Sequence, residues 1–343
     1  PPRSIAMAGE DGEGGADQGG ASAQALCTQA HAEYIAAFQR DKGAYEYVAS
    51  EYLRLSGIYW GTTALRLLGK EALLPAGEVV ADVMRCWNEA ADGGFASAEG
   101  HDSHLLYTLS AVQVLVTHEA WPELDRVRDP VTRYVASLQR REDGAFFGDR
   151  LSQEVDTRFS YCALSCLSLL GTLGKGPDGE KGPPVDLDAA AGFVLSCQNF
   201  DGGFGARPGD ETHAGQVFVC VGALDILGKA AGAALGQPPL ADRLDADRLG
   251  WWLCERQTPG GGLNGRPQKL QDVCYTWWVL SSLSMMGKLH WVHRDSLVQF
   301  ILDCQDPIDG GISDRPDDEV DIFHTFFGVA GVSLLRHGGP GAR

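Results

Sequence analysis

The chain has 343 residues, of which 44% are hydrophobic, so it can bury a large core. Its formal net charge of -18 makes nucleic acid and anionic membrane surfaces poor partners. The nine cysteines form no CxxC pair, and no apolar run is long enough to cross a bilayer, which predicts reduced thiols in the cytosol and no transmembrane segment.

Glycine, alanine and acidic residues dominate positions 1–26, so we expect a disordered N-terminal tail. Two later segments, 171–186 and 229–240, are rich in glycine and predict surface loops. Residues 337–343 are also glycine-rich and predict a flexible C-terminal tail. The folded domain is therefore expected to span 27–336.

An internal repeat organises that domain. Glycine-centred turns recur at a period of about fifty residues, at Gly93, Gly144, Gly202, Gly261 and Gly310. Most follow an amphipathic segment that ends near a glutamine, such as WWLCERQ, and each precedes a segment that is apolar almost all round, such as CYTWWVLSSLSMMG. A helix that is apolar all round is buried on every side, and no strand periodicity is present. The pattern predicts an all-α fold, an α/α toroid of about six helix pairs with apolar inner helices inside amphipathic outer ones.

Polar side chains recur at the start of each predicted inner helix. They are Asp102 with His104, Asp156 with Arg158, Glu211 with His213, Asp272 with Cys274, and Asp321 with His324. Acidic residues are ordinary helix caps, which would explain the acids but not the histidine, arginine and cysteine residues beside them. Because inner helices that run the same way begin at one end of a toroid, we expect these residues to meet at one mouth.

A metal site is one interpretation of this mouth. Asp272, Cys274 and His324 offer oxygen, sulfur and nitrogen, which are ligands that zinc accepts, and three protein ligands leave a position open for substrate. From the spacing alone, ordinary packing of these residues remains the alternative.

Basic residues precede the same helix. Arg266, Lys269 and Tyr275 fall near its start, and His213 lies at the start of the preceding inner helix. Basic groups at helix N-termini form anion sites, although surface ion pairs would place the same residue types there. The inner helices also carry many aromatic residues, which either fill a core or line an apolar cavity.

Segments 262–280 (GLNGRPQKLQDVCYTWWVL) and 310–335 (GGISDRPDDEVDIFHTFFGVAGVSLL) resemble the signatures of protein prenyltransferase β subunits. Segments 50–61 and 154–165 are similar to the Rab-specific branch of that family, and the similarity covers roughly residues 32–335. The resemblance implies transfer of a geranylgeranyl group from geranylgeranyl diphosphate to C-terminal cysteine thiols of Rab GTPases, forming thioethers. It also implies an α subunit as heterodimer partner and a Rab escort protein.

The resemblance assigns roles to particular residues. Zn²⁺ is expected at Asp272, Cys274 and His324, and the diphosphate or prenyl donor at His213, Ala214, Gly215, Arg266, Lys269, Tyr275 and Trp278. Arg266, Lys269 and Tyr275 would be catalytic, stabilising charge on the leaving diphosphate. Arg158 and Asp314 are polar candidates of the cavity, and Mg²⁺ at Asp314 is a second metal prediction, with a solvated or capping aspartate as the alternative.

The expected lipid pocket is lined by Ser56, Tyr59, Trp60, Leu109, Tyr161, Trp277 and Phe327. Ser56 stands where farnesyl enzymes carry a bulky aromatic residue, and Leu109 replaces a larger tyrosine, so both predict room for a twenty-carbon chain. Tyr161 stands where phenylalanine is common among the Rab enzymes.

Other functions remain open. A type I geranylgeranyltransferase or a farnesyltransferase usually reads CYSFW where this chain reads CYTWW at 274–278. A terpene cyclase shares the toroid but carries a DxDD acid motif that is absent here, and a non-enzymatic helical scaffold would bind no zinc.

Overall fold

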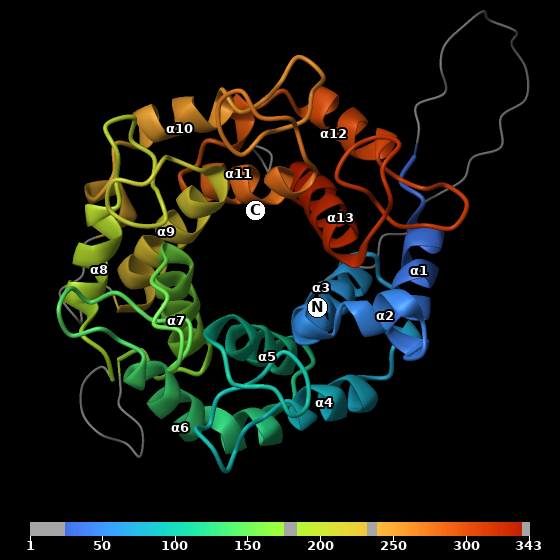
Figure 1. Ribbon diagram of the computed structural model, residues 1–343. Helices are drawn as coiled ribbons and strands as arrows, with labels where there is room; N and C mark the ends of the chain where they lie inside the picture. Colours follow the sequence, from blue (N-terminus) through green and yellow to red (C-terminus); the bar gives the residue numbers. More distant parts are fainter. Residues whose placement is uncertain (1–24, 175–183, 232–238, 338–343) are drawn as a thin grey trace, which may run out of the picture.

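The computed structural model describes residues 25–174, 184–231 and 239–337, and its helices form two concentric rings within these ranges (Figure 1). The inner ring is made of α3 (Arg54–Leu67), α5 (Leu105–Thr117), α7 (Thr157–Leu169), α9 (Ala214–Ile226), α11 (Cys274–Met285) and α13 (Ile322–His337). The outer ring is made of α1 (Thr28–Arg40), α4 (Ala76–Arg85), α6 (Trp121–Ser137), α8 (Leu187–Ser196), α10 (Ala246–Cys254) and α12 (Arg294–Asp303). A short helix, α2 (Tyr45–Ala49), precedes α3.

The inner ring is closed. Each inner helix contacts the next, and α13 returns to contact α3. In α9 the consecutive residues from Val217 to Leu224 are all buried, so every side of the helix is covered. The described residues carry isolated β-bridges but no named strand. The predicted α/α toroid of about six helix pairs is therefore confirmed.

The recurring glycines hold neighbouring outer helices together. All five have φ between +79° and +88°, a region that side chains disfavour. A Cβ at Gly144 would lie 2.2 Å from the carbonyl carbon of Ala189 in α8. One at Gly310 would lie 2.2 Å from the Ala30 carbonyl oxygen in α1, so the last turn packs on the first outer helix. Glycine is needed at this period because each turn touches the next outer helix.

The recurring glutamines explain the other part of the repeat. The Gln257 side-chain amide donates to the His293 carbonyl over 2.9 Å and accepts from the His293 N–H over 2.8 Å. Since His293 precedes α12, the amide fixes the start of the next outer helix. Gln305 makes a related pair of contacts where the last turn meets α1: it donates to the Ala25 carbonyl over 3.1 Å and accepts from the Cys27 N–H over 3.0 Å.

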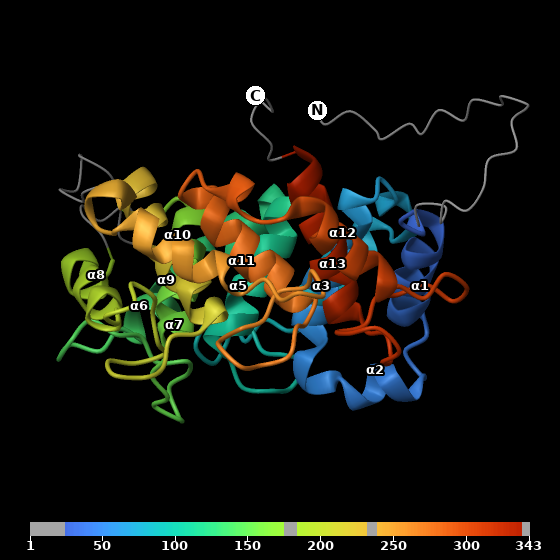
Figure 2. The ribbon, with the colours of Figure 1, turned by 90° about the horizontal axis from the view of Figure 1, so that it is seen from above.

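All inner helices begin at one end of the toroid, which we call the mouth. The loops that lead into them gather there, at the lower edge of Figure 2, together with α2. Each loop also reaches back to the previous inner helix: the Ala214 N–H donates to the Gly265 carbonyl over 2.8 Å, and the Val273 N–H donates to the Asp314 carbonyl over 3.0 Å. Most of the tails predicted at 1–26 and 337–343, and parts of both predicted surface loops, lie outside the described residues.

Candidate functional site

Three potential metal ligands meet at the mouth. Asp272 and Cys274 lie at the start of α11, and His324 lies in the first turn of α13. One ligand atom from each falls within 4.8 Å of the others, and this is the one such group found among the described residues. Asp272 Oδ1 lies 3.3 Å from His324 Nε2 and also accepts the Cys274 N–H over 2.7 Å. The tight turn into α11 thus points the carboxylate and thiol the same way.

Asp321 orients His324, a role that the sequence analysis did not assign. Its Oδ2 lies 2.6 Å from His324 Nδ1, and its Oδ1 accepts the His324 N–H over 2.8 Å. A hydrogen bond from Nδ1–H to a carboxylate leaves the Nε2 lone pair free toward the other two ligands. The Asp-x-x-His spacing at a helix start is the sequence signal that could have identified it.

The electrostatics of the group favour a bound cation. Burial alone would lower the pKa of His324, but hydrogen bonds to Asp272 and Asp321 raise it to about 9. Burial and then the neighbouring Asp272 carboxylate raise the pKa of the Cys274 thiol well above its usual value. A divalent ion would relieve both effects because it stabilises the thiolate and replaces the imidazole proton. A mixed oxygen, sulfur and nitrogen set fits zinc and not magnesium or calcium, which prefer oxygen alone.

A cationic cleft of about 530 Å³ lies beside the metal ligands and includes Asp272 in its wall. The other lining residues are His213, Arg266, Gln268, Lys269, Leu270, Gln271, Tyr275, Asp314 and Arg315. His213 Nε2 lies 3.2 Å from the Tyr275 hydroxyl. Burial and the Arg266 charge lower the pKa of His213, while burial and nearby anionic groups raise that of Tyr275 to about 12. The two side chains therefore favour their neutral forms and can donate hydrogen bonds to an anion.

The cleft differs in one respect from the anion site expected of a bare helix N-terminus. Ala214 is fully buried and its N–H is bonded to Gly265, while the Gly215 N–H donates to His213 Nδ1 over 3.1 Å. Neither residue lines the cleft. His213, through its side chain, is therefore the residue by which this end of α9 contributes to the cleft. Trp278, predicted to contact the diphosphate or the prenyl donor, lines the apolar cavity.

Arg266 is held by an acid from the preceding loop. Its guanidinium pairs with Glu211, and both side chains are substantially exposed. Asp314, the magnesium candidate, pairs with Arg315 over 3.0 Å. Burial and a hydrogen bond from Asp318 raise the pKa of Asp314.

An apolar cavity of about 260 Å³ lies inside the inner ring and is lined by residues from α3, α5, α7, α9, α11 and α13. Every residue predicted for the lipid pocket lines it: Ser56, Tyr59, Trp60, Leu109, Tyr161, Trp277 and Phe327. Arg158 also reaches it and pairs with Asp156 over 3.0 Å. The aromatic walls come from neighbouring inner helices, as in the contact between Phe218 of α9 and Trp278 of α11, where the ring centroids are 4.9 Å apart.

Ser56 and Leu109, the two small residues from which a deeper pocket is predicted, both line this cavity. Ser56 Oγ is 3.2 Å from Ser110 Oγ, so the buried hydroxyls satisfy each other. Tyr161 fits because Gly222 stands opposite: a Cβ there would lie 2.8 Å from the tyrosine ring. The tyrosine is thus accommodated by its neighbouring helix without displacing the cavity wall.

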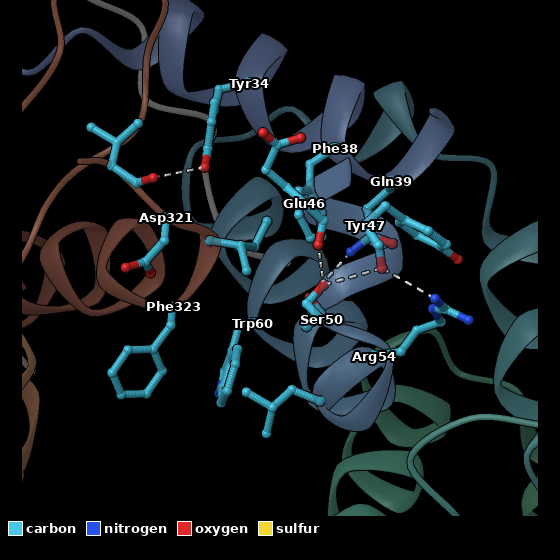
Figure 3. Close-up of a pocket in the computed structure, with 14 residues that line it drawn as sticks. Tyr34, Phe38, Gln39, Glu46, Tyr47, Ser50, Arg54, Trp60, Asp321 and Phe323 are labelled. Carbon is cyan, nitrogen blue, oxygen red and sulfur yellow. Dashed lines mark hydrogen bonds between the residues drawn. The ribbon is translucent and has the colours of Figure 1, made fainter. Parts of the chain in front are cut away.

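A second apolar pocket, of about 540 Å³, lies between α1, α2, α3 and the start of α13 (Figure 3). Trp60 and Leu53 line both this pocket and the central cavity. Phe323 lines it as well and packs edge-on against His324 at 4.9 Å between ring centroids. The second pocket therefore adjoins the central cavity at Leu53 and Trp60 and reaches Phe323, which contacts His324.

Comparisons with known proteins agree with this geometry. A sequence profile of the prenyltransferase alpha-alpha toroid domain matches residues 26–341. The chain is 49% identical to the geranylgeranyl transferase type-2 subunit beta of Saccharomyces cerevisiae, over 91% of this chain and 90% of the relative. It is 50% identical to the type-2 subunit beta 1 of Arabidopsis thaliana, over 92% and 90%.

More distant relatives include the type-1 subunit beta of Arabidopsis thaliana, 31% identical over 58% of this chain and 51% of the relative. Among solved structures, the Candida albicans protein geranylgeranyltransferase-I complexed with GGPP superposes with a TM-score of 0.75 at 22% identity, covering 91% of this chain and 92% of that one. The type II terpene cyclase MstE from Scytonema reaches 0.54 at 14% identity, over 91% and 98%. At these identities the two structures show a shared fold.

Proposed function

The chain belongs to the prenyltransferase alpha-alpha toroid family, and we propose that it is the catalytic β subunit of a type-2 protein geranylgeranyltransferase. The reaction would join the geranylgeranyl group of geranylgeranyl diphosphate to a C-terminal cysteine of a Rab GTPase. One observation carries the proposal: Asp272 belongs both to the cluster of potential metal ligands and to the wall of the cationic cleft. A thiol and a diphosphate bound at these places would lie side by side.

The cleft residues would act on the leaving group. The substrate thiol loses its proton to solvent, its sulfur forms a bond to carbon 1 of the donor, the carbon–oxygen bond breaks, and diphosphate leaves with the bonding electrons. Arg266 and Lys269 would neutralise the charge that develops on the diphosphate, and Tyr275 and His213 would donate hydrogen bonds. Removing one such donor typically slows a reaction about 100-fold or more.

Asp272, Cys274 and His324 would hold a zinc ion. When bound, zinc would supply a Lewis acid that favours the thiolate form of the substrate cysteine. Asp321 would keep the His324 ring in place. Cys274 would act as a ligand only, so the attacking sulfur belongs to the substrate. We place the candidate Mg²⁺ contact at Asp314, where a cation would have to compete with Arg315.

The central cavity would bury the isoprenoid chain. Its walls are aromatic and apolar, and Ser56 and Leu109 occupy positions where larger side chains would shorten it. This supports a twenty-carbon donor in preference to the fifteen-carbon farnesyl group.

The relatives at about half identity are named as β subunits of type-2 transferases, which supports a heterodimer with a prenyltransferase α subunit. From the resemblance to Rab-specific enzymes we also propose a Rab escort protein as the partner that presents the substrate. No helix in the described part of the chain is long and apolar enough to cross a membrane.

The test is prenyl transfer by the purified αβ heterodimer. With Rab and escort protein, we expect transfer from geranylgeranyl diphosphate and little from farnesyl diphosphate. Transfer to short C-terminal peptides without the escort protein would indicate a type-1 or farnesyl enzyme instead, and no transfer from either donor would contradict the proposal.

A further inference from the structure

Three successive loops at the mouth share one local structure, and each contains an arginine followed by proline. The arginines are Arg207, Arg266 and Arg315. Two residues after each arginine the backbone has a positive φ: +87° at Gly209, +64° at Gln268 and +70° at Asp317. Three residues after each arginine an N–H donates back to the arginine carbonyl, from Asp210, Lys269 and Asp318. The three arginines therefore occupy equivalent positions of the repeat.

The residue that closes this turn determines whether the arginine forms an ion pair within its own loop. Asp210 and Asp318 each pair with the arginine of their own loop, with nitrogen to oxygen distances of 3.2 Å in both cases. Lys269 stands at the equivalent place in the middle loop. A lysine cannot pair with Arg266, whose guanidinium reaches Glu211 in the preceding loop instead. This exchange of an acid for a lysine makes the middle loop the most cationic of the three.

Arg315 belongs to the same cleft as the middle loop. It lines the cleft together with Arg266 and Lys269, whereas Arg207 does not. Its side chain contacts Asp314 and Asp318 and is 37% exposed. Exposed ion pairs of this kind contribute about 1 kcal/mol or less, so a more highly charged anion in the cleft can displace them.

We infer that Arg315 is a further diphosphate-binding residue, an inference that rests on the proposed function. In the free cleft its guanidinium rests on Asp314 and Asp318. A bound diphosphate offers a fork of oxygens that suits the planar guanidinium, which turns from Asp318 to the ligand. Arg315 then closes the cleft from the α13 side as Arg266 and Lys269 do from the α11 side.

The experiment compares three variants of the αβ heterodimer. Arg315→Gln removes the charge, Asp318→Asn releases the arginine from its acid, and Arg207→Gln is the matched control outside the cleft. Calorimetry would give the Kd for inorganic diphosphate and for geranylgeranyl diphosphate, and steady-state assays the KM for donor and for Rab. We expect Arg315→Gln to weaken diphosphate binding about tenfold and to raise the donor KM, the size expected for loss of one charge-assisted contact.

Asp318→Asn should tighten diphosphate binding, which a purely structural role for the Arg315–Asp318 pair would not do. Arg207→Gln should bind diphosphate like the unmodified heterodimer. If Arg315→Gln behaves like Arg207→Gln, or raises only the KM for Rab, the inference is wrong, because Arg315 would then bind no diphosphate or would bind the protein substrate instead. If the unmodified heterodimer transfers no prenyl group, the proposed function itself is refuted. If it transfers normally and Arg315→Gln leaves diphosphate binding unaltered, only this inference is refuted.

Discussion

His324 Nδ1 lies 2.6 Å from Asp321 Oδ2, three residues earlier in the chain, and the His324 N–H is bonded to the other oxygen of the same carboxylate. One aspartate thus caps α13 and fixes the imidazole that faces Asp272 and Cys274.

Replacing Asp321 should weaken metal binding without removing a ligand. In Asp321→Ala the His324 ring loses its orienting partner, and we expect zinc affinity to fall by roughly 10- to 100-fold. Competition with a chromophoric chelator would measure the change. Glu319→Gln is the control, since Glu319 is an exposed acid of the same loop. Equal zinc affinity in the two variants would show that Asp321 does not support the site.

Filling the cavity at Ser56 should change donor choice. A tryptophan there would occupy space next to Ser110, so transfer of the longer geranylgeranyl chain should fall more than transfer of farnesyl. The ratio of kcat/KM for the two donors is the measurement. Ser110→Ala removes the partner hydroxyl without adding volume and should leave the ratio nearly unaltered. An unchanged ratio in Ser56→Trp would mean that the chain does not reach this position.

The seam between α1 and the last turn should be sensitive to acid. His31 is fully buried, its Nδ1 accepts the Gly311 N–H over 3.0 Å, and burial lowers its pKa, opposed by the Gln305 hydrogen bond and the Asp306 charge. A histidine with a lowered pKa contributes stability that is present above the unfolded value of about 6.5 and is lost as the pH falls through the folded value.

We therefore expect the melting temperature of the heterodimer to decline below about pH 6.5. In His31→Gln, whose amide can accept and donate in the same place without titrating, that decline should be shallower. His290→Gln, at an exposed position, serves as the control. The same acid profile in all three proteins would contradict a role for His31.

The turn glycines should be irreplaceable where they touch the next helix. Gly310→Ala adds a Cβ 2.2 Å from the Ala30 carbonyl oxygen, while Gly69→Ala meets nothing within 4 Å although both residues have positive φ. The alanine at Gly69 should cost about 1 kcal/mol from backbone strain alone. Gly310→Ala should cost at least about 2 kcal/mol more because the helix must shift. Chemical denaturation would compare them, and similar losses would argue against the contact.

Much of the fold could be predicted because the same sequence motif repeats about every fifty residues. The turn glycines and the all-round apolar segments recur often enough to reveal two rings, and the polar residues at the starts of the inner helices place the mouth. Hydrophobic periodicity could not show that Gly265 and Asp314 bond back to earlier inner helices, because such contacts join separate repeats. Ala214 and Gly215, which the resemblance alone places at the prenyl donor, stay predictions, and their N–H groups are hydrogen-bonded within the protein.

The sequence predicted only some of the residues that form the candidate site. The roles of Asp272, Cys274, His324 and the cleft residues stay predictions, although their side chains lie where those roles require. The pairing of Arg266 with Glu211 and the position of Arg315 depend on how neighbouring loops pack, which no single segment encodes. The Arg-Pro pair that recurs in three equivalent loops is the sequence signal that could have identified Arg315.

Metal content and transfer activity, measured on one preparation of the heterodimer, test the central claim most directly. We predict one zinc ion per β subunit and geranylgeranyl transfer to Rab, with zinc and transfer both lost in Cys274→Ser. Full activity in a zinc-free preparation, or a Cys274→Ser variant that keeps its zinc and its rate, would contradict the account.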